Sequence, residues 1–364
     1  MSVLINLPED ILGVIRSLLS PTDFLQLYLT SKSIFEETKR LKFIVLTWID
    51  SYKFYKDTKF RERVLSYVVS RDQLSLNLSR FGVDDIGEYH ISTFNFSECD
   101  NVIDVRELGG VNTLNLSYCH NVTNVSALGG VKNLNLSYCY NIRDVSALGD
   151  VNNLNLSYCP NVLDVGALGC VKTLNLSNCY NLCDVSALGG VQNLNLSHCY
   201  NVCDVSALGG VRNLNLKNCS NLTDVSALGG VHNLNLENCF DLTVVSALCG
   251  VHTLNLNNCQ NVVNVSALGG VNTLNLSNCL NILDVSALGG VNTLDLSSCY
   301  NVVDVSALGG VHTLDLSSCY NLVDVSALCN VNTLNLSHCY RVINVGALGG
   351  VNTLIIDNSI DCDY

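Results

Sequence analysis

The segment VNTLNLSYCHNVTNVSALGG, Val111–Gly130, decides the fold of this chain because close copies of it follow one another without gaps. Thirteen complete copies of twenty residues run from Ile91 to Gly350. Apolar residues stand at copy positions 1, 4, 6, 9, 12, 15 and 18, here Val111, Leu114, Leu116, Cys119, Val122, Val125 and Leu128. This spacing fits no α-helix, and only Leu114-Asn115-Leu116 alternates as a strand does. One copy cannot enclose its own apolar side chains, so we expect stacked coils that share a core.

The copies resemble the leucine-rich repeat, L-x-x-L-x-L-x-x-N/C-x-L, at the short end of its length range. The resemblance implies an α/β solenoid with a short parallel sheet on its concave face. Copy positions 2, 3, 5, 7 and 8 would face that surface, and position 10 would lie at its rim. We expect Asp144 and Asp184, at position 14, to cap a turn by accepting a backbone N–H. Gly129 and Gly130 would supply left-handed or extended geometry.

Nineteen cysteines raise the question of metal or disulfide chemistry. Cys119 and its twelve counterparts occupy position 9, which points inward, and we expect each thiol to pack there and donate weakly to a neighbouring carbonyl. The sequence predicts no metal and no cofactor. A redox or metal role stays open for the cysteines outside this column, above all for Cys183 and Cys203, which lie one copy apart. These cysteines are Cys170, Cys183, Cys203, Cys249, Cys329 and Cys362.

Charge and hydropathy exclude several classes of partner. Residues 1–90 hold 12 Lys/Arg and 12 Asp/Glu, so the net charge of −13 belongs to the rest of the chain. An acidic repeat region repels phosphate backbones, and we expect no nucleic-acid partner. No apolar run is long enough to span a membrane, and we expect no membrane partner. The start of the chain lacks a basic leader, and with many cysteines this favours a reducing, cytoplasmic or nuclear location.

The first residues predict amphipathic helices, with an apolar stripe that Pro21 breaks and Asp23 restarts. This stretch resembles the F-box at Leu7, Pro8, Ile11, Leu12, Ile15, Ser17, Leu19, Pro21, Asp23, Leu25, Leu27, Leu29, Ser31 and Lys32. The resemblance implies a small all-α domain at residues 1–48 that binds the Skp-type adaptor of a cullin-based ubiquitin ligase. The adaptor-binding residues would be Leu7, Pro8, Ile11, Ile15, Leu19, Pro21, Asp23, Leu25 and Leu27.

An alternative is that residues 5–48 only form a helical cap over the first coil. An F-box joined to such repeats is similar to proteins of protists and of the large DNA viruses that infect them, which would place a viral protein in the host cytoplasm. Residues 49–90 are expected to hold one linking helix, at 49–70, and a degenerate capping coil. Leu74 and Leu76 lie twenty residues before the first array positions, but the LNLS of Leu76–Ser79 is two residues out of step, which leaves the register open. Residues 351–364 form a partial repeat whose Asp357, Asp361 and Asp363 would protect the sheet edge.

The copies differ from one another mainly at positions 2, 8, 10 and 13. Tyrosine, asparagine, serine and histidine dominate positions 8 and 10, which is typical of protein-binding surfaces. The predicted partner-binding residues are Tyr118, Tyr138, Tyr158, Tyr140, Tyr180, Tyr200, Phe240, Tyr300, Tyr320 and Tyr340. Six of them form two predicted clusters, an early one at Tyr118, Tyr138 and Tyr158 and a late one at Tyr300, Tyr320 and Tyr340. The alternative is that stacked tyrosines only stabilise the ladder.

Two further columns carry weaker signals. Position 13 becomes apolar late in the array, at Val263, Leu283, Val303, Val323 and Ile343, where the side chains are either exposed for a partner or buried against the adjoining coil. Position 2 carries six basic residues of the array, namely Lys132, Lys172, Arg212, His232, His252 and His312.

No arrangement of residues predicts an enzyme, because no phosphate loop and no nucleophile, base and acid set can be assembled from these columns. We therefore expect a non-catalytic interaction adaptor, with the F-box-like helices on a Skp-type adaptor and the concave face on an unidentified target protein. The alternatives are a leucine-rich repeat scaffold or host-interaction module whose helices are only a cap, and a metal or redox buffer.

Overall fold

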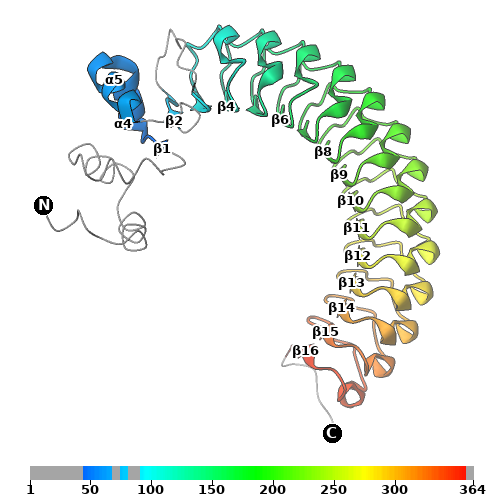
Figure 1. The fold of residues 1–364 in the computed structure, drawn as a ribbon. Helices are drawn as coiled ribbons and strands as arrows, with labels where there is room; N and C mark the ends of the chain where they lie inside the picture. The colour runs from blue at the N-terminus through cyan, green and yellow to red at the C-terminus, as the bar shows by residue number, and fades with distance from the viewer. Residues whose placement is uncertain (1–43, 68–73, 81–90, 358–364) are drawn as a thin grey trace, which may run out of the picture. The chain divides into compact units, whose positions relative to one another are not determined.

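A computed structural model describes residues 44–67, 74–80 and 91–357 (Figure 1). The chain divides into two compact units, residues 1–155 and 156–364, which are taken in turn. Within the described ranges no helix has both the length and the apolar character needed to cross a membrane. The F-box-like stretch Leu7–Lys32 lies outside them.

The first unit contains two α-helices followed by the start of the repeat array. Its strands pair in parallel in chain order, each with its successor, and its loops contain short 3-10 helices. The elements are β1 (Ile44–Val45), α4 (Trp48–Lys56), α5 (Thr58–Tyr67), β2 (Leu74–Asn77), β3 (Thr93–Asn95), η3 (Arg106–Leu108), β4 (Thr113–Asn115), η4 (Ser126–Gly130), β5 (Asn133–Asn135), η5 (Ser146–Leu148) and β6 (Asn153–Asn155).

The second unit is built from repeat coils, each with one three-residue strand and one 3-10 helix. The strands are β7 (Thr173–Asn175), β8 (Asn193–Asn195), β9 (Asn213–Asn215), β10 (Asn233–Asn235), β11 (Thr253–Asn255), β12 (Thr273–Asn275), β13 (Thr293–Asp295), β14 (Thr313–Asp315), β15 (Thr333–Asn335) and β16 (Thr353–Ile355). The 3-10 helices are η6 (Gly166–Cys170), η7 (Ser186–Gly190), η8 (Ser206–Gly210), η9 (Ser226–Gly230), η10 (Ser246–Gly250), η11 (Ser266–Gly270), η12 (Ser286–Gly290), η13 (Ser306–Gly310), η14 (Ser326–Leu328) and η15 (Val345–Leu348).

The strands of the second unit line the inner side of a curve, and the 3-10 helices lie on the outer side (Figure 1). Neighbouring strands are parallel and in register, so that Leu234 lies beside Leu214 and Leu254. The predicted leucine-rich repeat solenoid, with a parallel sheet on its concave face, is therefore confirmed.

The chain changes direction within each coil at two polar residues, whose side chains accept hydrogen bonds from backbone N–H groups two residues later. After the strand, the Ser117 N–H donates to Oδ1 of Asn115 at 3.0 Å, which bends the chain away from the sheet. At position 14, Oδ1 of Asp184 accepts the Ser186 N–H at 2.9 Å, and Asp144 accepts from its own coil in the same way. The prediction that these aspartates cap a turn is confirmed.

The core is the set of inward positions that the repeat predicts. Leu116, Cys119 and Leu128 are each 0% exposed, and the same positions are buried in the other coils. The Cys119 thiol donates to the carbonyl of Phe96 in the preceding coil at 3.1 Å, so the predicted weak donor role is confirmed. Burial raises the pKa of Cys119 and Cys139 to about 12, which keeps both as neutral thiols.

The expected role of the paired glycines is wrong, since the left-handed backbone lies elsewhere. Position 8 carries it, with φ of 61° at Tyr118 and 60° at Asn178. Glycine is needed at position 19 because the next coil comes close there: a Cβ on Gly189 would lie 2.3 Å from the carbonyl oxygen of Ala207. The glycine pair therefore sets how closely the outer turns stack.

Two helices, α4 and α5, stand where one linking helix was expected at 49–70. The first ends at Lys56, and Asp57 then accepts the Phe60 N–H at 3.1 Å with its side chain to start the second. Helix α4 packs on β2, because the Ser51 hydroxyl accepts the Asn77 N–H at 2.9 Å and Phe54 is fully buried. Helix α4 therefore covers the start of the sheet, and α5 packs against α4. The last residues of the expected all-α domain form strand β1, which pairs with β2.

The degenerate coil takes the register of its LNLS motif. Leu76 pairs with Phe94, so Leu76 and Leu78 occupy copy positions 4 and 6. The twenty-residue register, which would give those positions to Leu74 and Leu76, is wrong, because this coil is two residues shorter than the others. At the other end of the array, the Asp357 carboxylate accepts the His338 N–H at 2.6 Å. In earlier coils the backbone N–H at this position donates to a backbone carbonyl of the next coil. Asp361 lies outside the described residues, as does Asp363.

Candidate binding surface

The strand side of each coil presents three of the four positions at which the copies differ, namely 2, 8 and 10. Positions 3 and 5 project from the strand on this side, and the left-handed residue at position 8 follows it. A left-handed backbone disfavours most side chains and suits asparagine, which holds position 8 in five coils of the second unit. Tyrosine is less stable than asparagine in this backbone conformation. The ring of Tyr118, which adopts it, is 39% exposed.

The early aromatic cluster, in the first unit, contains four rings. Tyr118 stacks on Tyr138 with 4.1 Å between ring centroids. His120 stacks on Tyr140 at 5.0 Å, and Tyr138 meets Tyr140 edge-on at 6.3 Å. His120 was not among the predicted binding residues, although it stands in the aromatic column at position 10. Tyr158 belongs to the second unit and is half-buried.

The late cluster, in the second unit, is a row of stacked rings. Tyr300 stacks on Tyr320 at 5.0 Å, and Tyr320 lies nearly parallel to Tyr340 at 6.5 Å. His338, which was also not among the predicted residues, holds the Tyr340 hydroxyl with its Nδ1 atom at 2.8 Å. The stack helps to hold the coils together, but Tyr340 remains 63% exposed.

Three further predicted residues stand on the rim between these clusters. Tyr180, Tyr200 and Phe240 are 38%, 44% and 43% exposed. Tyr200 makes an edge-on contact with His198, and its hydroxyl lies 3.1 Å from Nδ1 of that ring. The structure describes no ring contact for Tyr180 or Phe240, so these two do not join either cluster.

A groove of about 480 Å³ runs across β7 to β11 of the second unit. Its floor contains two columns of asparagine and threonine from positions 3 and 5. At position 3 the amide of Asn233 donates to Asn213, Asn213 to Asn193, and Asn193 to Thr173, so the column is one directed chain of hydrogen bonds. Such a floor is rigid and still has amide donors and acceptors to offer a ligand.

A second chain of amides borders the groove at position 8. Asn258 donates to Asn238 at 2.8 Å, and Asn238 donates to Asn218 at 2.8 Å. Nδ2 of Asn218 lies 3.1 Å from Nε2 of His198, where the chain ends beside Tyr200. The groove therefore has an ordered polar border on the side that carries the exposed aromatic residues.

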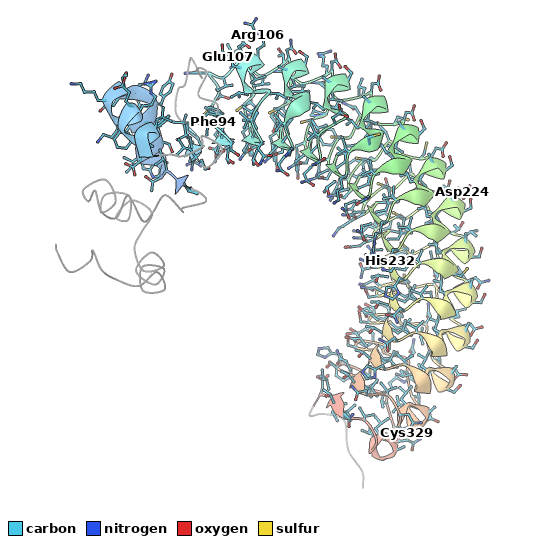
Figure 2. All side chains as sticks on the ribbon, in the orientation of Figure 1. Phe94, Arg106, Glu107, Asp224, His232 and Cys329 are labelled. Atoms are coloured by element: carbon cyan, nitrogen blue, oxygen red, sulfur yellow. The ribbon has the colours of Figure 1, made fainter. Side chains whose placement is uncertain are left out.

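The basic side chains at position 2 and the aspartates at position 14 lie on opposite faces of the second unit. His232, at position 2, projects on the strand side, and Asp224, at position 14, projects on the outer side (Figure 2). Lys172, Arg212 and His252 share position 2 and are exposed, and the rings of His232 and His252 stack at 4.7 Å. Hydrogen bonds from the serine two residues later lower the pKa of six aspartates at position 14. These are Asp184, Asp204, Asp224, Asp284, Asp304 and Asp324.

The apolar residues at position 13 are exposed, so the alternative in which the adjoining coil buries them is wrong. Val263, Leu283, Val303 and Ile343 are between 54% and 63% exposed, and Val323 is half-buried. They lie one residue before the acidic column.

The cysteines outside the core column are mostly exposed. Cys170, Cys183, Cys203 and Cys249 are exposed and Cys329 is half-buried, while Cys362 lies outside the described residues. Over the part of the chain that the structure describes, no three His, Cys, Asp or Glu side chains come together as a metal site.

The predicted adaptor-binding residues all lie outside the described ranges. They are Leu7, Pro8, Ile11, Ile15, Leu19, Pro21, Asp23, Leu25 and Leu27. The described part of the expected F-box domain is Ile44–Trp48, of which Val45 and Trp48 are 54% and 57% exposed.

Comparison with a solved internalin structure supports the fold. An internalin of Listeria monocytogenes (inlF) matches with a TM-score of 0.52 and 17% identity, over 85% of this chain and 94% of that protein. The functional domain of InlJ from Listeria monocytogenes, described as including a cysteine ladder, has a TM-score of 0.48 and 16% identity, over 76% and 70%. A leucine-rich repeat protein of Leptospira interrogans has a TM-score of 0.47 and 16% identity, over 78% and 83%. No protein-family model and no curated protein matches the sequence.

Proposed function

We propose that this protein is a non-catalytic adaptor that binds a target protein on the concave face of its repeats. The observation that carries the proposal is that constant and variable residues occupy different positions within each coil. Positions that face the core are nearly constant and buried, whereas positions 2, 8 and 10 differ between copies. Positions 2 and 10 are mostly exposed, and position 8 is mostly half-buried. Side chains that vary on a constant, rigid framework are what a recognition surface requires.

The tyrosines at position 8 favour binding over a purely structural role. Tyr118, Tyr138 and Tyr158 all have φ near +60°, a conformation that asparagine adopts more readily. Ring stacking returns only about 0.5–1.5 kcal/mol for such a pair. A tyrosine at a costly backbone position with an exposed ring is typical of a site kept for contact with a partner.

The second half of the proposal is that the F-box-like segment binds a Skp-type adaptor of a cullin-based ubiquitin ligase. Its support is the sequence resemblance across Leu7–Lys32. The competing interpretation gives that segment the task of capping the first coil. Helix α4 packs on β2 and α5 packs on α4, and Phe54, Phe60 and Val64 of these helices are at most 4% exposed. Helix α4 therefore supplies part of the cover for the first coil that the cap interpretation assigns to the F-box-like segment.

The target-binding half is tested by selecting short random peptides, displayed on phage, against the full chain. An inner-face variant combines Tyr200→Ala, Phe240→Ala, Tyr320→Ala and Tyr340→Ala, all at exposed rings. A matched outer-face variant combines Asp184→Asn and Asp224→Asn. We expect enriched peptides to lose binding to the inner-face variant and keep it for the outer-face variant. Equal binding to both variants, or no enrichment at all, contradicts the proposal.

A further inference from the structure

The inner face of coils β7 to β11 has the opposite sign of charge from the chain as a whole. At copy positions 2, 3, 5, 7 and 8 of these coils, all described, the charged residues are Lys172, Arg212, Lys217 and Glu237. Lys217 and Glu237 form an ion pair at 2.9 Å, and among the described residues no carboxylate lies within ion-pair distance of Lys172 or Arg212. Two exposed cations therefore border a polar groove in a protein of net charge −13.

Exposed aromatic residues, here called the aromatic border, follow three of these strands along the chain, beyond the residues that line the groove. Tyr180, Tyr200 and Phe240 follow strands β7, β8 and β10 at position 10, and the amide chain at position 8 separates them from the floor. A ligand in the groove thus meets cations where the strands begin and rings where they end. This combination selects a segment with both acidic and apolar side chains.

We infer that this groove binds an extended acidic segment of a partner protein, with its carboxylates beside Lys172 and Arg212 and its apolar side chains toward the aromatic border. The inference rests on the proposed function, since it names the chemistry of the target. Asp or Glu supplies the charge in this inference, and a phosphoserine version of the segment, which has similar anionic chemistry, is a separate arm of the test.

The spacing of the coils suits an extended peptide that crosses the strands. Neighbouring parallel strands lie about 4.8 Å apart, so Lys172 and Arg212, two coils apart, are separated by about 10 Å along the groove. Extended chain covers about 3.3 Å per residue, so three residues span that distance. The floor asparagines lie beneath this path and can hydrogen-bond to the backbone of the bound segment.

The charge pattern further along the array limits the length of the acidic segment. The floor column at position 5 changes from asparagine to Asp295 on β13 and Asp315 on β14. A long polyanion such as single-stranded nucleic acid would meet these carboxylates, and the acidic outer column disfavours its approach. A short acidic segment ends before it reaches them.

The first step of the test is to sequence the peptides that the full chain enriches from the phage library. In the second step, the affinity of synthetic copies of these peptides is measured for charge-reversed variants. The test variant carries Lys172→Glu and Arg212→Glu. The matched control is Lys132→Glu, which changes the same copy position in the first unit, away from the groove. We expect enriched peptides to be acidic and to bind the double variant at least tenfold more weakly, with little change for the control. Raising the salt concentration should weaken binding to the unmodified chain.

Further synthetic arms separate the sources of charge. Each acidic peptide is compared with a version in which Glu is replaced by Gln, a version with phosphoserine, and an oligothymidine of similar length. Loss of binding with Gln supports the inference, and binding of the phosphoserine version shows that phosphate also serves. Enriched peptides that are neutral or basic, or equal binding by the charge-reversed variant, overturn the inference while the proposed function stands. Preference for oligothymidine also overturns it, and no enrichment at all removes the proposed function itself.

Discussion

The carboxylate of Asp184 accepts the backbone N–H of Ser186 at 2.9 Å, and this contact recurs in most coils. The hydrogen bonds from Ser186 lower the pKa of Asp184. A carboxyl group whose pKa is lower in the folded state stabilises the fold above its unfolded pKa, near 3.9, and loses that contribution as the pH falls through the folded value. The repeat array should therefore lose stability below about pH 4.

Asparagine is the matched substitution, because Asn264 already holds the same contact in one coil, where its Oδ1 accepts the Ser266 N–H at 3.0 Å. We expect a variant with Asp184, Asp204 and Asp224 changed to Asn to remain folded and to lose less stability between neutral pH and pH 3 than the unmodified chain. Urea unfolding at a series of pH values measures this. Parallel pH profiles for the two proteins would count against the capping role.

The close stacking at position 19 predicts a second effect. A Cβ on Gly189 would lie 2.3 Å from the Ala207 carbonyl oxygen, so the outer turns must separate to admit it. We expect Gly189→Ala to cost about 1–3 kcal/mol of unfolding free energy, as overpacking does. Gly349→Ala is the control, since nothing lies within 4 Å of its added Cβ. Similar unfolding midpoints for the two variants would show that coil stacking does not constrain this position.

Thiol reactivity should divide the cysteines into two classes. The core column is buried, and its pKa is raised to about 12 at Cys139 and Cys219, so these thiols present almost no thiolate. We expect iodoacetamide to label Cys170, Cys183, Cys203 and Cys249 in the native protein and to reach the core column only after denaturation. Mass spectrometry of the labelled peptides locates the sites. Early labelling of Cys139 would contradict the packing of the coils.

Replacing tyrosine by asparagine at position 8 separates stability from binding. In a variant with Tyr118→Asn and Tyr138→Asn, the loss of ring stacking, about 0.5–1.5 kcal/mol, opposes the gain from residues that suit φ near +60°. We expect the unfolding midpoint to change little and the affinity for any ligand that contacts this cluster to fall. A large drop in the midpoint would mean that the tyrosines serve the ladder itself.

The core and the direction of the sheet could be predicted from sequence because both follow from periodicity. Each copy places Leu116 and Cys119 and their counterparts at the same inward positions, and only stacking can cover them. The left-handed residue was harder to locate. Tyr118 gives no sign of it, but asparagine at Asn178 and Asn218 in the same column did carry the signal.

Features that depend on the neighbouring coil could not be read from one copy. The need for glycine at Gly189 arises from the carbonyl of the next coil, not from its own backbone angles. The exposure of Leu283 likewise depends on how closely adjacent turns pack, which the apolar character of the residue does not reveal. His120 was missed as a member of the early cluster because histidine differs from the tyrosines of its column, although its ring stacks on Tyr140.

The measurement that tests the proposed adaptor role most directly is a calorimetric titration of the full chain with a purified eukaryotic Skp-type adaptor. Three proteins are compared: the unmodified chain, a variant with Leu7, Pro8 and Ile15 changed to Ala, and the inner-face variant at Tyr200, Phe240, Tyr320 and Tyr340. We expect the unmodified chain and the inner-face variant to bind equally and the Leu7, Pro8, Ile15 variant to lose binding while keeping the same unfolding midpoint. No binding by the unmodified chain, or full binding by a folded Leu7, Pro8, Ile15 variant, would contradict the adaptor role.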